Sequence, residues 1–200
     1  MHRRLLPSLL AWPLPALARG FLADDRAVAL LREGGLNLYL RHGITDRSQI
    51  DSGRRGDRAG QRNLSPAGRA QAARLGEAFR TLGIPVAEVL TSEVFRARDT
   101  AELAFGQARV EPDLIADDYT PGDASEDARR VSRRLAEPVA GGNRVMVGHI
   151  VPLGLILGQS LSQAEFPEGA AAVFRPRGTG WEWLGVIRAE QLTRTAGLGD

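Results

Sequence analysis

The chain of 200 residues lacks cysteine entirely. This absence excludes disulfide bonds, thiolate metal ligands and cysteine nucleophiles. Lysine is absent too, so all 26 basic residues are arginines, whose guanidinium groups stay charged near neutral pH. With 24 acidic residues, the formal net charge is only +2, which gives no electrostatic reason to expect binding to nucleic acid.

Long apolar runs are scarce, with one exception near the N-terminus. Arg3 and Arg4 precede a mostly apolar run that ends in the small-x-small sequence Ala16-Leu17-Ala18. This order is typical of a secretory signal peptide, and the run is too short to span a bilayer as a stable helix. We expect residues 1–18 to be removed on export by a Sec or twin-arginine route, which leaves a periplasmic or secreted protein without stable membrane insertion. The alternative is an apolar helix that packs on the domain.

Residues 19–200 are enough for a single domain, and 43% hydrophobic with 25% charged residues is ordinary for a soluble globular protein. Short apolar runs at 36–40, 86–90 and 145–147 predict buried strands, and two further strands are expected near 172–175 and 181–187. Helical patterns lie between the first three of these predicted strands. This alternation predicts a three-layer α/β/α sandwich with a mostly parallel central sheet.

Two helix starts can be placed from capping residues. Ser65 precedes Pro66, a favoured first helical residue, and an apolar stripe follows as far as Gly83. Ser92 is expected to cap a second helix that ends near Gly106. Residues 43–62 are polar and rich in turn formers, so they predict a long loop.

Reactive side chains follow three of the predicted strands, as Arg41-His42, as Ser92 to Arg96, and as Gly148-His149. Ligands of such sheets bind beyond the carboxyl ends of the strands. His2 leaves with the signal peptide, so the mature chain keeps only His42 and His149. One histidine at a strand end is more often structural than catalytic, but two, with no others in the mature chain, favour a functional site.

These residues carry a resemblance to a known family. The segment Leu40-Arg41-His42-Gly43, followed by Thr45, resembles the Arg-His-Gly signature of the histidine phosphatase superfamily, which includes phosphoglycerate mutases and acid phosphatases. Three further segments match in order: Asn63-Leu64-Ser65-x-x-Gly68-x-x-Gln71-Ala72, Ser92-x-x-x-Arg96-x-x-x-Thr100-Ala101, and Val147-Gly148-His149. The resemblance implies a phosphoglycerate mutase-like fold and a phosphomonoester hydrolase with His42 as nucleophile.

The family's chemistry suits the residue types. A neutral imidazole nitrogen can attack phosphorus and leave again, provided that an acceptor such as a backbone carbonyl holds the proton on the other nitrogen. Phosphoryl transfer needs cationic donors for the equatorial oxygens. By resemblance, Arg41, Arg96 and His149 form this phosphate pocket around His42, and neither metal nor cofactor is needed. Arg62 and Asn63 are candidate contacts to the substrate phosphate.

The proton donor for the leaving group stays open between acidic residues. Ile150 follows His149, where some relatives place an aspartate. Asp118 or Asp117 is therefore the candidate general acid, and Glu168 is a weaker one; a solvated acidic loop is the alternative. We expect the other arginines of the 43–62 loop to be solvated or disordered. If they form a cationic rim, they suit a multiply charged substrate such as a phosphorylated glycan.

Three other functions compete with a histidine phosphatase. A zinc hydrolase is disfavoured because no paired ligand spacing accompanies the histidines. A serine hydrolase is disfavoured because Gly-x-Ser-x-Gly is missing. A non-catalytic protein that binds phosphorylated ligands in a degenerate phosphatase pocket is the remaining alternative; its intact arginines and histidines speak against it, and the uncertain acid speaks for it.

Overall fold

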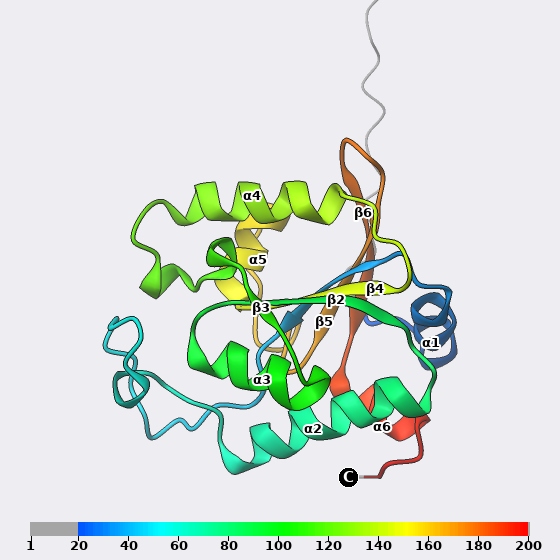
Figure 1. The fold of residues 1–200 in the computed structure, drawn as a ribbon, viewed down its shortest axis with the longest axis horizontal. Helices are drawn as coiled ribbons and strands as arrows, with labels where there is room; N and C mark the ends of the chain where they lie inside the picture. The colour runs from blue at the N-terminus through cyan, green and yellow to red at the C-terminus, as the bar shows by residue number, and fades with distance from the viewer. Residues whose placement is uncertain (1–19, 200) are drawn as a thin grey trace, which may run out of the picture.

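The computed structural model describes residues 20–199, so the expected signal peptide lies outside the described residues. Strands and helices alternate along most of the chain (Figure 1). The elements are α1 (Asp24–Glu33), β1 (Asn37–Arg41), α2 (Pro66–Thr81), β2 (Val86–Thr91), α3 (Phe95–Phe105), β3 (Arg109–Val110), α4 (Ala124–Ala136), β4 (Asn143–Gly148), α5 (Ile150–Leu157), β5 (Ala171–Pro176), β6 (Trp181–Ile187) and α6 (Ala189–Thr195). Single 3-10 turns lie at Arg58–Gly60, Pro112–Leu114 and Asp117–Tyr119.

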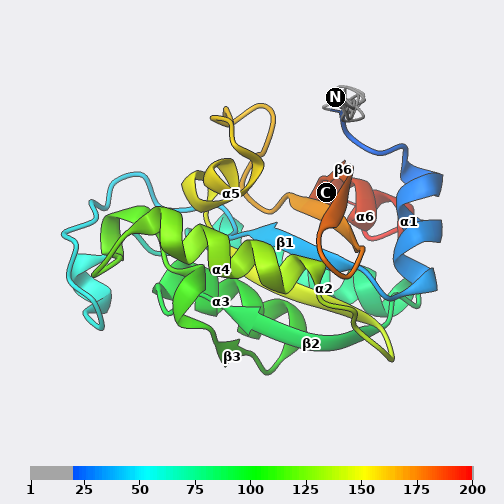
Figure 2. The ribbon, with the colours of Figure 1, turned by 90° about the horizontal axis from the view of Figure 1, so that it is seen from above.

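The sheet of the described chain has the order β3-β2-β4-β1-β5-β6. Pairing is parallel from β3 through β1, whereas β5 runs antiparallel to both of its neighbours. Helices α4 and α5 lie on one face, and α2, α3 and α6 lie on the other (Figures 1 and 2). The expected three-layer α/β/α sandwich with a mostly parallel sheet is confirmed.

Strand β1 is buried on both faces, as its apolar run predicts. Leu38 and Leu40 belong to the core on the side of α2, together with Phe79. Tyr39 points the other way and belongs to the core on the side of α4 and α5, together with Leu153. Because β1 is held from both sides, the position of the residues that follow it is fixed by the packed centre of the molecule.

The two expected helix caps have different outcomes. The hydroxyl oxygen of Ser65 accepts a hydrogen bond from the Gly68 backbone N–H at 3.0 Å, so the cap of α2 is confirmed. Ser92 does not cap α3, which begins at Phe95 with Val94 as its N-cap. The Ser92 hydroxyl instead accepts from the Val94 backbone N–H at 3.2 Å within the turn that leads from β2 into α3.

Helices α5 and α6 are not predicted from the sequence. Helix α5 has eight residues, nearly all apolar, so its pattern has no helical periodicity to detect. Helix α6 has only seven residues. None of the helices within residues 20–199 has both the length and the apolar character needed to cross a membrane.

Candidate phosphate-binding site

Three neighbouring parallel strands bring the candidate residues together. In the sheet β4 lies between β1 and β2, so the ends of the strands that precede His42, Ser92 and His149 are adjacent. Arg41 pairs with Gly148 and Thr91 with Val147, which puts the three ends at the same level. The structure thus places His42, His149, Arg41 and Arg96 at one edge of the sheet, each only 3–4% exposed.

Hydrogen bonds define the protonation of His42. Its Nδ1 lies 2.9 Å from the Gly43 carbonyl oxygen. A carbonyl can only accept, so Nδ1 carries the proton and Nε2 keeps its lone pair in the neutral ring. Burial first, and then the positive charge of Arg96, holds the pKa of His42 well below the ordinary 6.5, despite the bond to Gly43. The ring is therefore a neutral base at neutral pH.

His149 faces His42 across the site, with ring centroids 5.3 Å apart. Its Nε2 lies 3.0 Å from the Ser92 hydroxyl oxygen. The Tyr39 hydroxyl donates to the His149 carbonyl at 3.0 Å and accepts from the His149 backbone N–H at 3.1 Å. Burial, followed by the charge of Arg96, holds the pKa of His149 well below 6.5 as well.

The arginines of the site have unused hydrogen-bond donors. Within residues 20–199, four buried side-chain polar atoms have no hydrogen-bond partner: the Nε atoms of Arg41, Arg62 and Arg96 and the Nδ1 of His149. Leaving a buried donor unsatisfied costs about 1–3 kcal/mol, and more when it is charged. Three unused arginine donors in one buried cluster with a neutral imidazole are complementary to an anion with several acceptor oxygens.

Arg41 and Arg62 differ in how they are held. The Nη1 of Arg41 donates to the Phe166 carbonyl at 2.6 Å and to Gln163 Oε1 at 2.7 Å. Burial lowers the pKa of Arg41 to about 10, which still leaves it charged at neutral pH. The charge of Arg62 contributes to the lowered pKa values of Arg41 and His42, so this loop arginine lies within electrostatic reach of both.

Asn63 does not share this arrangement. Its side-chain amide nitrogen donates to the Gln61 carbonyl at 2.6 Å, the Arg58 carbonyl at 2.9 Å and Gln49 Oε1 at 3.0 Å. These bonds lie within the 43–62 loop and its junction with α2. Of the two residues that the sequence suggests as further phosphate contacts, the structure therefore brings Arg62 to the site and uses Asn63 to order the loop.

The candidate acids occupy different environments. Asp118 is exposed, whereas Asp117 is half-buried. Burial raises the pKa of Asp117 above its ordinary value, the charge of Asp118 adds to this, and the charge of Arg96 works against it. Glu168 accepts a hydrogen bond from the Thr45 hydroxyl at 2.7 Å, and its charge favours the protonated form of Arg41.

The 43–62 loop is docked on the start of α3, where it lies beside the ends of the parallel strands (Figure 1). Arg58 makes a two-pronged ion pair with Asp99, at 2.6 and 2.8 Å, and its guanidinium lies 4.1 Å from the centre of the Phe95 ring. Arg55 is paired with Glu93. The side chains of Arg55 and Arg58 are exposed, as expected of solvated residues, but ion pairs with acidic residues from a segment distant in sequence also hold them in place.

Two site residues were not predicted from the sequence, Asp51 and Tyr119. The Oδ1 of Asp51 accepts from Arg96 Nη1 at 2.9 Å and from the Tyr119 hydroxyl at 2.6 Å. Asp51 lies in a polar loop without periodicity, and Tyr119 lies in a short acidic segment. Neither position has a sequence signal that would relate it to Arg96.

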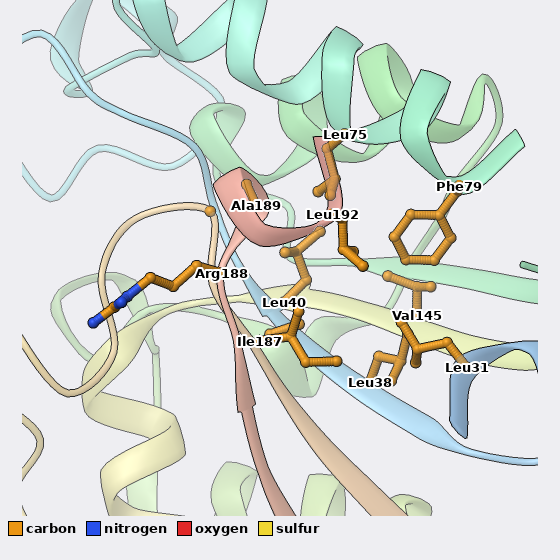
Figure 3. Close-up of a pocket in the computed structure, with 12 residues that line it drawn as sticks. Leu31, Leu38, Leu40, Leu75, Phe79, Val145, Ile187, Arg188, Ala189 and Leu192 are labelled. Carbon is orange, nitrogen blue, oxygen red and sulfur yellow. The ribbon is translucent and has the colours of Figure 1, made fainter. Parts of the chain in front are cut away.

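A small cavity elsewhere does not extend this site. It lies in the core between the sheet and helices α2 and α6, and Leu38, Leu75, Phe79 and Leu192 are among its lining residues (Figure 3). Its volume of about 10 Å³ is at the lower limit for one water molecule. Among residues 20–199, no group of three or more histidine, aspartate and glutamate side chains is arranged to hold a metal ion.

Fold and site together define a three-layer α/β/α protein with a buried cluster of histidines and arginines at the carboxyl edge of its sheet. Residues 38–118 match the model of the histidine phosphatase superfamily (branch 1). This stretch contains Arg41, His42 and Arg96, and β4 adds His149 from outside it. Over these 81 of its 200 residues, the chain is similar to that superfamily. No curated protein sequence is a significant match to it.

Solved structures of phosphatases have the same fold. The protein histidine phosphatase SixA, complexed with tungstate, is 16% identical, with a TM-score of 0.57 over 78% of this chain and 99% of the other. A mutant phosphoserine phosphatase from Entamoeba histolytica, in complex with phosphoserine, is 12% identical, with a TM-score of 0.56 over 78% and 98%. A mycobacterial glucosyl-3-phosphoglycerate phosphatase is 18% identical, with a TM-score of 0.51 over 74% and 97%.

Proposed function

We propose that the protein is a metal-independent phosphomonoester hydrolase that works through a phosphohistidine intermediate on His42. One observation carries the proposal. Three arginine Nε atoms and His149 Nδ1 are buried without hydrogen-bond partners, and they belong to the same cluster as a neutral imidazole whose Nε2 is unprotonated. A phosphoryl group would satisfy the three arginine donors, and His149 Nδ1 as well in the tautomer that carries a proton there, and it would present its phosphorus atom to His42 Nε2.

In the first step, His42 Nε2 attacks phosphorus in line with the ester oxygen. The bond from phosphorus to the new nitrogen forms while the bond to the leaving oxygen breaks, and that oxygen takes a proton from a carboxylic acid. Arg41, Arg62, Arg96 and His149 hold the equatorial oxygens. In the second step, water gives its proton to the carboxylate, its oxygen attacks phosphorus, and the P–N bond breaks. His42 and the carboxylic acid are regenerated, and inorganic phosphate is released.

Asp117 is the better-supported general acid of the two neighbouring aspartates. An acid that is protonated part of the time near neutral pH needs a raised pKa, and burial raises the pKa of Asp117. Electrostatic interactions with Arg96 and Tyr39 put it close to the site, whereas Asp118 is exposed. Glu168 is already engaged by the Thr45 hydroxyl.

The decisive experiment is turnover of an aryl phosphate by residues 19–200 in the presence of a chelator. We expect the wild-type protein to hydrolyse the aryl phosphate. It should also form a phospho-label that is lost in acid and stable in alkali, as is typical of phosphohistidine. His42→Ala should form no label and lose activity by about three orders of magnitude or more. An unchanged thermal unfolding midpoint confirms that the variant is folded.

Three outcomes separate the competing functions. Equal turnover by wild type and His42→Ala contradicts the assignment of the nucleophile. Loss of wild-type activity in chelator, restored by added zinc, points to a metal hydrolase. Binding of inorganic phosphate without turnover or label supports the non-catalytic phospholigand-binding protein.

We also propose that the substrate is a small phosphorylated compound met outside the cytoplasm, with a phosphorylated glycan as one candidate. Solved relatives include enzymes named for phosphoserine and for glucosyl-3-phosphoglycerate, both small phosphate esters. The N-terminal pattern of residues 1–18 supports export. Expression of the full chain followed by N-terminal sequencing of the mature protein tests cleavage after Ala18, and a panel of sugar, amino-acid and lipid phosphates tests the substrate class.

A further inference from the structure

Asp51 forms an ion pair with Arg96, an arginine of the proposed phosphate pocket. A single oxygen, Oδ1, accepts three hydrogen bonds: from Arg96 Nη1 at 2.9 Å, from the Tyr119 hydroxyl at 2.6 Å and from the Arg62 backbone N–H at 2.9 Å. The Asp51 side chain is 16% exposed and that of Arg96 only 5%. The contact is therefore largely shielded from water and is stronger than a surface ion pair.

The contact constrains how Arg96 faces the site. A guanidinium group is a rigid plane, so fixing the direction of Nη1 also fixes the direction of the other nitrogens. Nη1 points at Asp51, while Nε is buried without a partner. The Arg96 guanidinium also lies 5.8 Å from the centre of the Tyr119 ring, so the hydroxyl and the ring of one tyrosine act on both members of the pair.

Asp51 is unsuited to donate a proton itself. Burial alone would raise its pKa, but the hydrogen bonds from Tyr119 and Arg62 and the charge of Arg96 together hold that pKa below the ordinary aspartate value. An ionised carboxylate with three donors on one oxygen can accept but not donate. Its role must therefore be exerted through the groups that it binds.

We propose that Asp51 is a positioning residue of the phosphatase reaction, which holds Arg96 in the orientation that binds the phosphoryl oxygens. The inference rests on the proposed function, because it gives Arg96 its task. The inference also assigns a role to the 43–62 loop. The loop places Asp51 beside α3, and the ion pairs of Arg55 and Arg58 hold the loop there.

The test is a double-mutant cycle in the mature protein with wild type, Asp51→Asn, Arg96→Ala and the double variant. Asp51→Asn keeps the shape of the side chain and removes its charge. In the wild-type background we expect kcat/KM for an aryl phosphate to fall about 10- to 100-fold, as is common when a supporting contact is removed. In the Arg96→Ala background, Asp51→Asn should change kcat/KM by less than about twofold, because the guanidinium group that Asp51 positions is already gone.

Two further variants separate positioning from simple docking of the loop. Glu93→Gln removes another ion pair between the loop and the start of α3 without touching Arg96, and it should leave kcat/KM within about twofold of wild type. Tyr119→Phe removes one donor to Asp51 and should give a smaller loss than Asp51→Asn. Thermal midpoints are measured for all of them.

The outcomes are distinct. An equal loss from Asp51→Asn in both backgrounds, or no loss in either, overturns the proposal; so does an equal loss from Glu93→Gln. If wild type turns over no phosphate ester, the proposed function fails, but the same four proteins still test Asp51 through their Kd for inorganic phosphate. A change in Kd that is seen only when Arg96 is present then supports the positioning role, and an equal change in both backgrounds contradicts it.

Discussion

The imidazole rings of His42 and His149 lie 5.3 Å apart, with their planes inclined by 54°. Each ring is buried, and each lies within the field of Arg96, so a proton added to either ring would be opposed by desolvation and by that charge. Burial and the charge of Arg96 therefore keep both histidines neutral at neutral pH. In the proposed reaction, a phosphate dianion beside the two rings would favour protonation of His149, the ring that is not proposed to attack.

The first prediction concerns stability at mildly acidic pH. Both histidine pKa values are well below 6.5 in the folded state, so below pH 6.5 the unfolded chain binds more protons and the free energy of unfolding falls. The slope approaches about 1.4 kcal/mol per pH unit for each histidine, until the folded pKa is reached. Denaturant titrations between pH 7 and pH 5 measure how the free energy of unfolding depends on pH.

His149→Gln is the control for this slope. The raised pKa of Asp117 acts in the opposite direction, but it does so in both proteins, so their difference isolates one histidine. Over the histidine range, the slope of wild type should exceed that of the variant by up to about 1.4 kcal/mol per pH unit. Parallel pH dependence in the two proteins would show that His149 titrates normally.

The second prediction concerns the support of His149 by Tyr39. Tyr39→Phe leaves the buried backbone N–H of His149 without its acceptor, which should cost about 1–3 kcal/mol of stability. In Gly148→Ala the new Cβ would lie 2.4 Å from the Tyr39 hydroxyl oxygen, so it should also destabilise the protein.

These two changes should be coupled. Once Tyr39→Phe has removed the hydroxyl, the alanine at 148 has less to displace, so the double variant should lose less stability than the sum of the single variants. Urea unfolding of the four proteins measures the coupling. Strict additivity would mean that Gly148 is required for a reason other than the approach of Tyr39.

The parts of the fold that could be predicted are those whose signal is local. The apolar run at 36–40 predicted β1, whose five residues are all buried, and a capping serine with Pro66 predicted the start of α2. His42 and His149 could be assigned to one edge of the sheet because parallel strands end together. Each of these inferences needs only a short stretch of sequence and a general rule of packing.

The parts that could not be predicted depend on contacts between distant segments. Asp51 meets Arg96 only because the loop folds back over α3, and no pattern in the loop encodes that meeting. Ser92 looks like a helix cap, yet α3 begins only at Phe95, and the Ser92 hydroxyl oxygen lies 3.0 Å from Nε2 of the distant His149. The choice between Asp117 and Asp118 depends on which carboxylate is buried, which adjacent positions in a sequence do not reveal.

The third prediction compares two glycines of α2. At Gly68 an added Cβ would lie 1.9 Å from the Ile44 carbonyl oxygen, and at Gly76 it would lie 1.9 Å from the Ala104 carbonyl oxygen. The free energy of unfolding of both alanine variants should therefore fall by about 1–3 kcal/mol or more. Because Ile44 is two residues after His42, Gly68→Ala should also reduce the kcat of the folded fraction about tenfold or more.

Gly76→Ala is the matched control, because its clash lies at the contact of α2 with α3. Its folded fraction should keep a kcat within about twofold of wild type. Stability from urea unfolding and kcat per folded molecule separate the two effects. An unchanged kcat in Gly68→Ala would mean that the turn after His42 absorbs the displacement without moving the nucleophile.

The fourth prediction concerns the general acid and uses the leaving group as the probe. An alkyl alkoxide needs a proton as it departs, whereas p-nitrophenolate does not. Asp117→Asn should therefore reduce kcat for an alkyl phosphate by about 10²- to 10⁴-fold, and for p-nitrophenyl phosphate by only about tenfold or less. Asp118→Asn is the isosteric control at an exposed neighbour, and it should leave both activities nearly unchanged.

The pH profile gives the same assignment a second test. Because the acid must be protonated, its raised pKa sets the alkaline limb of kcat for alkyl phosphates, and activity declines as pH rises through that pKa. The limb should vanish in Asp117→Asn and persist in Asp118→Asn. If instead the limb persists in Asp117→Asn and the loss does not depend on the leaving group, the proton comes from another residue, and Glu168, which is held by Thr45 beside the site, becomes the next carboxylate to substitute.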